Sequence, residues 1–166
     1  ASRTLIGRKL KKLEDVISVS VVEPALAAEG WKFGTYPGSN LDALNGATYM
    51  HQIYTSADPH YTGRATVPVL WDKLRGRIVS NESAEIIRMF NQAFDGLTGN
   101  RENFCPADRL AQIDAMNERL YARVNNGVYK AGFATSQAAY EEAVRPLFDS
   151  LDWLEARLSR QRWLVG

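Results

Sequence analysis

The chain has little of what several protein classes depend on. Among its 166 residues there is one cysteine, Cys105, and there are two histidines, His51 and His60. One cysteine cannot form an internal disulfide framework, which fits a reducing compartment, and we therefore expect a cytoplasmic protein. The histidines show no metal-ligand spacing with cysteine or carboxylates, so we expect no metal site and place both in packing or on the surface.

The sequence also lacks a long apolar run and a large excess of charge. No run approaches the length of a membrane span and no apolar signal segment opens the chain, so no membrane partner is expected. The net charge of +1 argues against nucleic acid as a partner. Basic residues do gather near the start of the chain, namely Arg3, Arg8, Lys9, Lys11 and Lys12. They alternate with apolar residues at helical spacing, which favours a solvated helix face.

The pattern over residues 1–95 is that of an α/β domain. The predicted elements are a helix at residues 3–13, a strand at 16–22, a long and weakly periodic insertion at 23–64, a two-stranded hairpin at 67–71 and 77–79, and a helix at 83–94. Because a loop as long as this insertion is usually functional, we expect site residues in it. A helix followed by a strand needs a strand in front of it to make a βαβ unit. The order therefore predicts a thioredoxin-like domain that lacks its first strand.

The second part of the sequence predicts helices. Residues 96–106 are polar and contain glycine, which is typical of a linker. In residues 107–166, apolar side chains recur at helical spacing from Leu110 to Val124 and again from Tyr140 to Leu158. Pro146 lies inside the second pattern and should kink or split that helix.

Both ends of the sequence look cut. The first residue, Ala1, is not methionine and stands inside a helical pattern, and the last four residues, 163–166, are apolar rather than polar. We therefore expect a fragment of a longer protein.

The most specific local pattern is Val67-Pro68 inside a β-branched run. Proline cannot donate to a sheet ladder, and the bond before proline is the one peptide bond that is cis at low cost. A cis Val67–Pro68 bond would leave the backbone of Val67 free to pair with an extended peptide, such as the cysteinyl part of glutathione. The alternative is an ordinary edge strand that contains proline.

Glu82 and Ser83 stand where the second strand of the hairpin ends and helical spacing begins. A helix that starts there would hold a carboxylate on its unpaired N–H groups, with the Ser83 hydroxyl as a further donor. The alternative is that Ser83 only caps the helix, and the two roles are compatible. Together with Pro68, these residues predict a glutathione site.

Several longer segments extend this pattern: Arg3-Thr-Leu-Ile, Ile17-Ser-Val-Ser-Val-Val, Gly30-Trp-Lys-Phe, Ala57-Asp-Pro-His-Tyr, Thr66-Val-Pro-Val-Leu-Trp-Asp-Lys, Asn81-Glu-Ser-Ala-Glu-Ile-Ile-Arg-Met and Asn125-Asn-Gly-Val-Tyr-Lys-Ala-Gly-Phe-Ala. In this order they resemble the glutathionyl-hydroquinone reductases, the Xi class of glutathione transferases. The resemblance implies a thioredoxin-like domain followed by part of the all-α C-terminal domain of glutathione transferases. It also implies glutathione as co-substrate, a glutathionylated quinol as substrate, and a homodimer at full length.

The resemblance adds three residues to the predicted site. It implies that Trp31 and Arg64 bind glutathione and that Tyr129 contacts the hydroquinone. From the residues alone, Trp31 could instead be local aromatic packing, Arg64 a surface arginine and Tyr129 a core residue at a helix end.

One departure from the family pattern concerns the nucleophile. The family places it in a Cys-Pro-Trp-Ala motif, of which this chain has only Ala1. Cys105 lies in the predicted linker, far from the helix start that would activate a thiol, and Ser2 we take as a cap. We therefore expect the chain by itself to be inactive.

Two other functions stay open at this point. One is an Omega-like thioltransferase or dehydroascorbate reductase, which would share Pro68, Glu82 and Ser83 but not the 125–134 motif. The other is a non-catalytic glutathione-binding protein.

Overall fold

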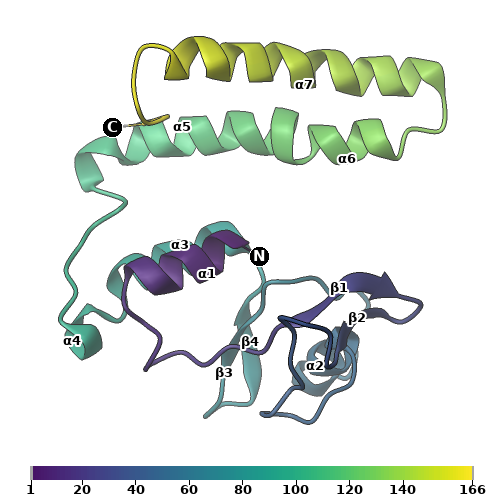
Figure 1. Cartoon of the computed structure of the whole chain (residues 1–166), viewed down its shortest axis with the longest axis vertical. Helices are drawn as coiled ribbons and strands as arrows, with labels where there is room; N and C mark the ends of the chain where they lie inside the picture. The colour runs from purple at the N-terminus through teal and green to yellow at the C-terminus, as the bar shows by residue number, and fades with distance from the viewer. Residues whose placement is uncertain (1, 166) are drawn as a thin grey trace. The chain divides into compact units, whose positions relative to one another are not determined.

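The computed structural model describes residues 2–165, which form two compact units with a boundary between Phe104 and Cys105 (Figure 1). The predicted linker, residues 96–106, contains part of a short helix and the boundary itself.

The first unit is built from two hairpins and four helices among its described residues. In chain order these are α1 Ser2–Leu10, β1 Val22–Ala27, β2 Gly30–Phe33, α2 Met50–Ala57, β3 Leu70–Asp72, β4 Arg77–Ser80, α3 Ser83–Gln92 and α4 Asp95–Thr98. Strand β1 pairs with β2 and β3 pairs with β4, both antiparallel. The predicted hairpin is thus confirmed, as are the helix predicted near the start of the chain, found as α1, and the helix predicted after the hairpin, found as α3.

Two expectations for this unit were wrong. Residues 16–21 form no strand: the first strand begins only at Val22. The β-branched run has no neighbouring strand to pair with among the described residues. Instead, the backbone N–H of Val21 donates to Asn40 Oδ1, and the backbone N–H of Asn40 donates to the Val21 carbonyl oxygen. The insertion 23–64 is also not a plain loop, because it carries β1, β2 and α2, and its aromatic residues Phe33 and Tyr54 are buried.

The β3–β4 hairpin separates two apolar clusters. One cluster consists of Phe33, Met50, Ile53 and Tyr54, and the other of Leu13, Ile86 and Phe90. Three alternate residues before and within β3, Val67, Val69 and Trp71, pack against the first cluster. Leu70, which lies between Val69 and Trp71, packs against the second cluster. This alternation is the period-2 pattern of an extended chain, so each face of the hairpin has its own core.

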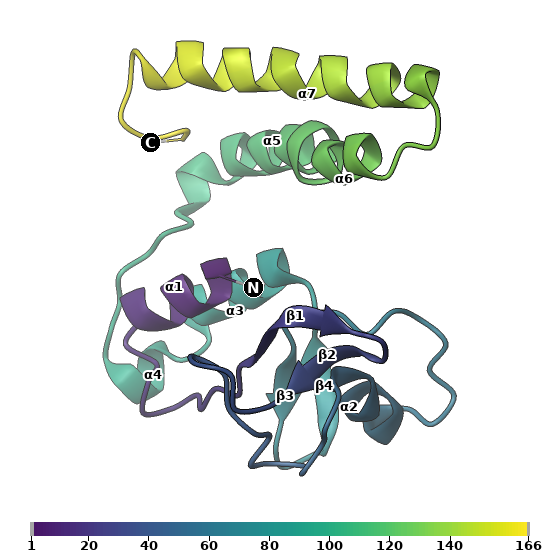
Figure 2. The ribbon, with the colours of Figure 1, turned by 45° about the vertical axis from the view of Figure 1, so that its right-hand side comes forward.

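Helices α1 and α3 lie side by side over the second cluster (Figure 2). The apolar side chains of Ile86 and Phe90 are four residues apart on α3, which places them on one face. A Cβ atom at Gly7 of α1 would lie 3.5 Å from Ile87. This distance is an ordinary van der Waals contact, so α1 and α3 are closely packed at Gly7.

Lys11 corrects the expectation of a fully solvated basic face. Its side chain is buried, and its Nζ lies 2.9 Å from Asp95 Oδ1. The same nitrogen donates to the carbonyl oxygens of Asn100, at 3.1 Å, and Glu102, at 2.6 Å. Burial is tolerated because the ammonium donates two hydrogen bonds to carbonyl oxygens and forms an ion pair with a carboxylate. Lys11 thus connects the end of α1 to α4 and to the segment that follows it.

The turn between β3 and β4 is fixed by Asp72. Its carboxylate accepts from the backbone N–H groups of Arg75, at 3.0 Å, and Leu74, at 2.9 Å, and from the Arg75 guanidinium at 2.9 Å. The bonds from Arg75, backbone first and then side chain, hold the pKa of Asp72 below its ordinary value. The turn therefore keeps its acceptor ionised and the hairpin closed.

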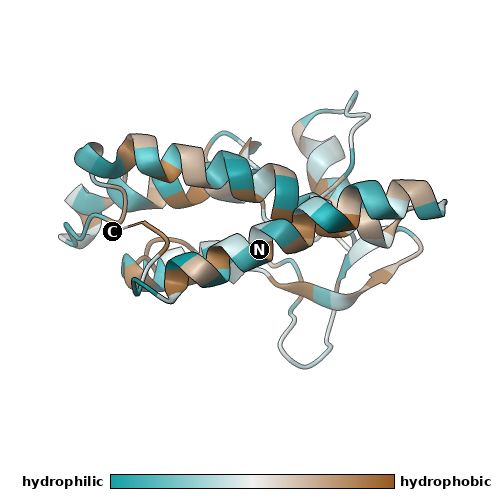
Figure 3. Cartoon of the chain, turned by 90° about the horizontal axis from the view of Figure 1, so that it is seen from above, coloured by the Kyte–Doolittle hydropathy of each residue, from teal (hydrophilic) through white to brown (hydrophobic). Residues whose placement is uncertain are grey.

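The second unit is a helical hairpin (Figure 3). A 3₁₀ turn at Ala107–Arg109 leads into α5 Leu110–Leu120, a π-helical turn at Tyr121–Asn125, α6 Gly127–Gly132 and α7 Gln137–Leu158. Both predicted helical segments are confirmed. The guanidinium of Arg119 lies 4.0 Å from the ring centroid of Trp153, a cation–π contact between α5 and α7.

Pro146 does not split the second helix, so that part of the expectation was wrong. Helix α7 runs through it for 22 residues. The start of the helix is capped by Ser136, whose Oγ accepts from the backbone N–H of Ala139 at 3.2 Å. Downstream, Ser150 donates its hydroxyl to the Pro146 carbonyl at 2.7 Å. Packing of buried Leu147 and Ser150 against the rest of the unit holds the segment helical. Within residues 2–165, no helix is long and apolar enough to cross a membrane.

Replacing Lys11 by alanine should lower the free energy of unfolding by about 3 kcal/mol, because it leaves Asp95 and two carbonyl groups without their buried partner. Urea denaturation followed by circular dichroism measures the change. Lys9→Ala is the matched control on the same helix, since the Lys9 side chain is 81% exposed and its ion pair with Glu14 lies on the surface. Equal midpoints for the two variants would contradict a stabilising role of Lys11.

Candidate functional site

The register of the β3–β4 hairpin brings two predicted site segments together. Leu70, the first residue of β3, pairs with Ser80, the last residue of β4, and the register shifts between Leu70 and Trp71. Just beyond this pair, Asn81 Nδ2 donates to Thr66 Oγ1 at 3.3 Å. The segment that contains Val67 and Pro68 therefore lies beside the start of α3.

The backbone before Pro68 has the predicted conformation. The Val67–Pro68 peptide bond is cis, which confirms the expectation drawn from the sequence. Thr66, the residue before Val67, is held by the buried Tyr54. The Tyr54 hydroxyl oxygen lies 3.0 Å from the carbonyl oxygen of Thr66 and 3.3 Å from the backbone nitrogen of Thr66. The segment is thus anchored to α2 on one side and to Asn81 on the other.

The start of α3 is organised by Ser80 rather than by Ser83. Glu82 is the N-cap residue, with an extended backbone, and Ser83 is the first residue of the helix. The Ser80 hydroxyl accepts from the backbone N–H of Glu82 at 3.0 Å and donates to Glu85 at 2.8 Å. The interpretation of Ser83 as the cap was therefore wrong. Neither the Ser83 hydroxyl nor the exposed Glu82 carboxylate takes part in capping the helix.

Arg3 is a residue that the sequence interpretation missed. Its Nε donates to Ser83 Oγ at 2.7 Å, which brings a positive charge from α1 to the start of α3. The Arg3 guanidinium thus lies at the N-terminal end of α3, an arrangement that favours an anion. A signal was present in the sequence, because a cation in the first turn of a helix opposes the helix dipole and calls for a compensating partner.

Trp31 and Arg64 lie in the same unit as these residues. Trp31 pairs with Leu26 in the first hairpin and packs, half-buried, against the same apolar cluster as Val67. Arg64 is exposed, and its carbonyl accepts from the Tyr61 hydroxyl at 3.0 Å, which fixes the backbone three residues before Val67. Their roles as ligands stay predictions.

Tyr129 and Cys105 belong to the second unit. Tyr129 lies in α6, 65% exposed, with its ring stacked on Phe133 at a centroid distance of 6.3 Å. Cys105 is half-buried at the start of the unit. Neither the quinol contact of Tyr129 nor the inertness of Cys105 is tested by this geometry, and both stay predictions.

The part of the chain that the structure describes holds no group of three or more histidine, cysteine or acidic side chains suited to a metal ion. His51 instead lies 3.5 Å from Glu29 and stacks on Tyr49, with ring centroids 5.7 Å apart.

Comparison with known proteins supports the fold. The family model described as glutathione S-transferase, N-terminal domain, matches residues 1–93. Glutathionyl-hydroquinone reductase PcpF of Sphingobium chlorophenolicum is 53% identical over all of this chain, which covers 53% of that protein.

Two solved structures extend the likeness to three dimensions. Glutathione transferase Xi 1 from Trametes versicolor is 51% identical with a TM-score of 0.96, over all of this chain and 59% of its own. The glutathione-bound structure of YqjG, a glutathione transferase homologue from Escherichia coli K-12, is 56% identical with a TM-score of 0.94, over 99% of this chain and 54% of its own.

The chain thus spans about half the length of the curated relatives it matches. Its expected thioredoxin-like domain and following helices are both found in these neighbours. From the family match over residues 1–93 and the identity to solved Xi-class structures, the chain belongs to the glutathione S-transferase family, alongside the Xi-class glutathionyl-hydroquinone reductases.

Proposed function

We propose that the first unit binds glutathione between the Val67–Pro68 segment and the start of α3. The observation that carries this proposal is the hairpin register, which sets a peptide-pairing backbone beside an anion-binding helix end. The backbone of Val67 pairs with the cysteinyl part of glutathione as an added strand would. A relative 56% identical to this chain, whose structure is described as glutathione-bound, supports the assignment.

The charged groups of glutathione find charged or hydrogen-bonding partners. The Glu82 carboxylate takes the ammonium of the γ-glutamyl end, and the Ser83 hydroxyl donates to its carboxylate. Arg64 pairs with the second carboxylate, and the Trp31 ring lines the site. Every group of this set stands on the first unit.

We further propose that a protein containing this chain reduces glutathionyl-hydroquinones. A cysteine thiolate attacks the glutathionyl sulfur, so that a protein–glutathione disulfide forms and the carbon–sulfur bond breaks. The electron pair goes to the quinol ring carbon, which takes up a proton, and the hydroquinone leaves. The thiolate of a second glutathione then attacks the mixed disulfide, which frees the cysteine and gives oxidised glutathione.

This chemistry needs an activated thiolate at a helix N-terminus, which in the family pattern precedes Ala1. Tyr129 holds the quinol oxygen through its phenol, since a phenol both donates and accepts. We place the protein in the cytoplasm, where the glutathione pool is reducing, and expect a homodimer at full length.

Glutathione binding should depend on Ser83 and Glu82. Ser83→Ala loses one hydrogen bond to a charged carboxylate, on the order of 1.5–3 kcal/mol, and should weaken retention on immobilised glutathione by roughly tenfold or more. Glu82→Gln removes the partner of the ammonium and should act in the same direction. Ser56→Ala, an exposed position on α2, is the control. Unchanged retention in both site variants, with unchanged circular dichroism, would reject the assignment.

The 166-residue chain alone should show no turnover of glutathionyl-hydroquinones, because Cys105 is in the wrong segment to act as the nucleophile. A longer protein, with a strand and a Cys-Pro-Trp segment before Ala1 and further helices after Gly166, should turn these substrates over. Preference for dehydroascorbate in that longer protein would favour the Omega-like function instead. Activity of the 166-residue chain that disappears in Cys105→Ser would refute our interpretation of the nucleophile.

In the longer protein, Tyr129→Phe should lower kcat with glutathionyl-hydroquinone while glutathione affinity stays nearly constant, because the phenol serves the aromatic substrate alone. Steady-state turnover and glutathione titration measure the two quantities. The neighbouring Tyr121→Phe, on the π-helical turn, is the control. Equal turnover of wild type and Tyr129→Phe would remove this residue from the site.

A further inference from the structure

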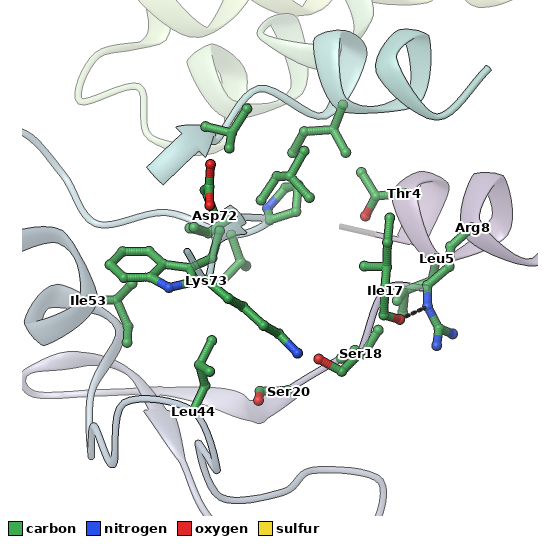
Figure 4. Close-up of a pocket in the computed structure, with 18 of the residues that line it drawn as sticks. Thr4, Leu5, Arg8, Ile17, Ser18, Ser20, Leu44, Ile53, Asp72 and Lys73 are labelled. Carbon is green, nitrogen blue, oxygen red and sulfur yellow. Dashed lines mark hydrogen bonds between the residues drawn. The ribbon is translucent and has the colours of Figure 1, made fainter. Parts of the chain in front are cut away.

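The two arginines of α1 are bonded in different ways. Arg8 donates from Nε to the Ile17 carbonyl oxygen at 2.6 Å and from Nη2 to the Glu14 carbonyl oxygen at 3.0 Å (Figure 4). It thus ties the chain that follows α1 back to the helix. Arg3 instead donates to a side chain, the hydroxyl of Ser83 at the start of α3. The Arg8 bonds therefore hold the fold, whereas the Arg3 bond reaches the proposed glutathione site.

The packing of α1 on α3 places Arg3 at this site. Arg3 and its partner Ser83 are 80 positions apart in the sequence. The next contact along both helices, between Gly7 and Ile87, has the same separation. The two helices therefore run side by side in the same direction, and the first turn of α1 lies beside the first residue of α3. The guanidinium is held at the start of α3 by this contact between helices.

The bond to Arg3 fixes the direction of the Ser83 hydroxyl proton. A guanidinium has N–H donors and no acceptor, so the Ser83 oxygen accepts in the 2.7 Å bond. One lone pair of that oxygen is thereby occupied, and the hydroxyl proton is directed to a different partner. At the first residue of a helix the backbone N–H groups also lack acceptors. A carboxylate is the partner that satisfies both the hydroxyl and the helix end.

The positive charge of Arg3 is not neutralised by the chain. Its side chain is exposed, and within residues 2–165 it forms no ion pair with a carboxylate. Helix α1 itself is not stabilised by this charge, because a cation in the first turn of a helix opposes the helix dipole. The charge is therefore available to an anionic ligand at the start of α3.

We propose that Arg3 is a positioning residue of the glutathione site. It directs the Ser83 hydroxyl to the carboxylate of the γ-glutamyl end and makes the site selective for ligands that carry this carboxylate. This inference rests on the proposed function, which assigns the Ser83 hydroxyl to that carboxylate. Because Arg3 acts through Ser83, it discriminates at the carboxylate and not at the ammonium, whose partner is Glu82.

The test is isothermal titration of the 166-residue chain with glutathione and with γ-aminobutyryl-cysteinyl-glycine, which lacks only the γ-glutamyl carboxylate. Arg3→Met keeps an unbranched stem but removes the donors and the charge. It should weaken glutathione binding about fivefold and change binding of the analogue by less than about twofold. Lys9→Met is the matched control, since it removes the same charge from the same helix at a side chain that is 81% exposed. It should leave the affinity for both ligands unchanged.

A double-mutant cycle with Ser83→Ala separates positioning from direct contact. Once the hydroxyl is removed, Arg3 has nothing to orient, so Arg3→Met should weaken glutathione binding by less than about twofold in the Ser83→Ala background. The same loss in both backgrounds would mean that Arg3 reaches the carboxylate by itself, and it would overturn the positioning role.

The remaining outcomes distinguish this inference from the proposed function. A wild-type chain that binds neither ligand would reject the proposed function and the role of Arg3 with it. If the wild type binds glutathione but Arg3→Met loses affinity for both ligands equally, the Arg3–Ser83 bond is only a contact between helices. Unchanged glutathione binding in Arg3→Met would likewise refute the role of Arg3, while the proposed function would stand.

Discussion

The antiparallel ladder between β3 and β4 is the constraint on which the rest of the first unit depends. Its pairing of Leu70 with Ser80, together with the Asn81–Thr66 bond just beyond it, brings the segment that contains Val67 and Pro68 beside the start of α3. Its pleat divides the core, since Val67, Val69 and Trp71 contact one cluster and Leu70 the other. A one-residue slip would exchange these faces and separate the site at the same time. Stability of the core and geometry of the site therefore share one cause.

The charged residues of α1 serve positions far away in the sequence. Lys11 at its end is buried against Asp95, and Arg3 at its start bonds Ser83 on α3. A buried ammonium is stable only with acceptors in place, so Lys11 also fixes the chain that follows α4. Charge here specifies where a helix sits, in addition to the apolar contact near Gly7. The helix is thus held at both ends.

Local chemistry made much of this arrangement predictable, and long-range partners account for what was missed. The cis bond before Pro68, the hairpin and the helix at Ser83 follow from proline, from the turn at Arg75-Gly76 and from helical spacing in the sequence. Burial of Lys11 could not be foreseen, because its acceptors are some ninety residues away. Residues 16–21 have strand composition but no ladder, since a strand exists only with a neighbour. The roles of Trp31 and Arg64 rest on the family resemblance alone.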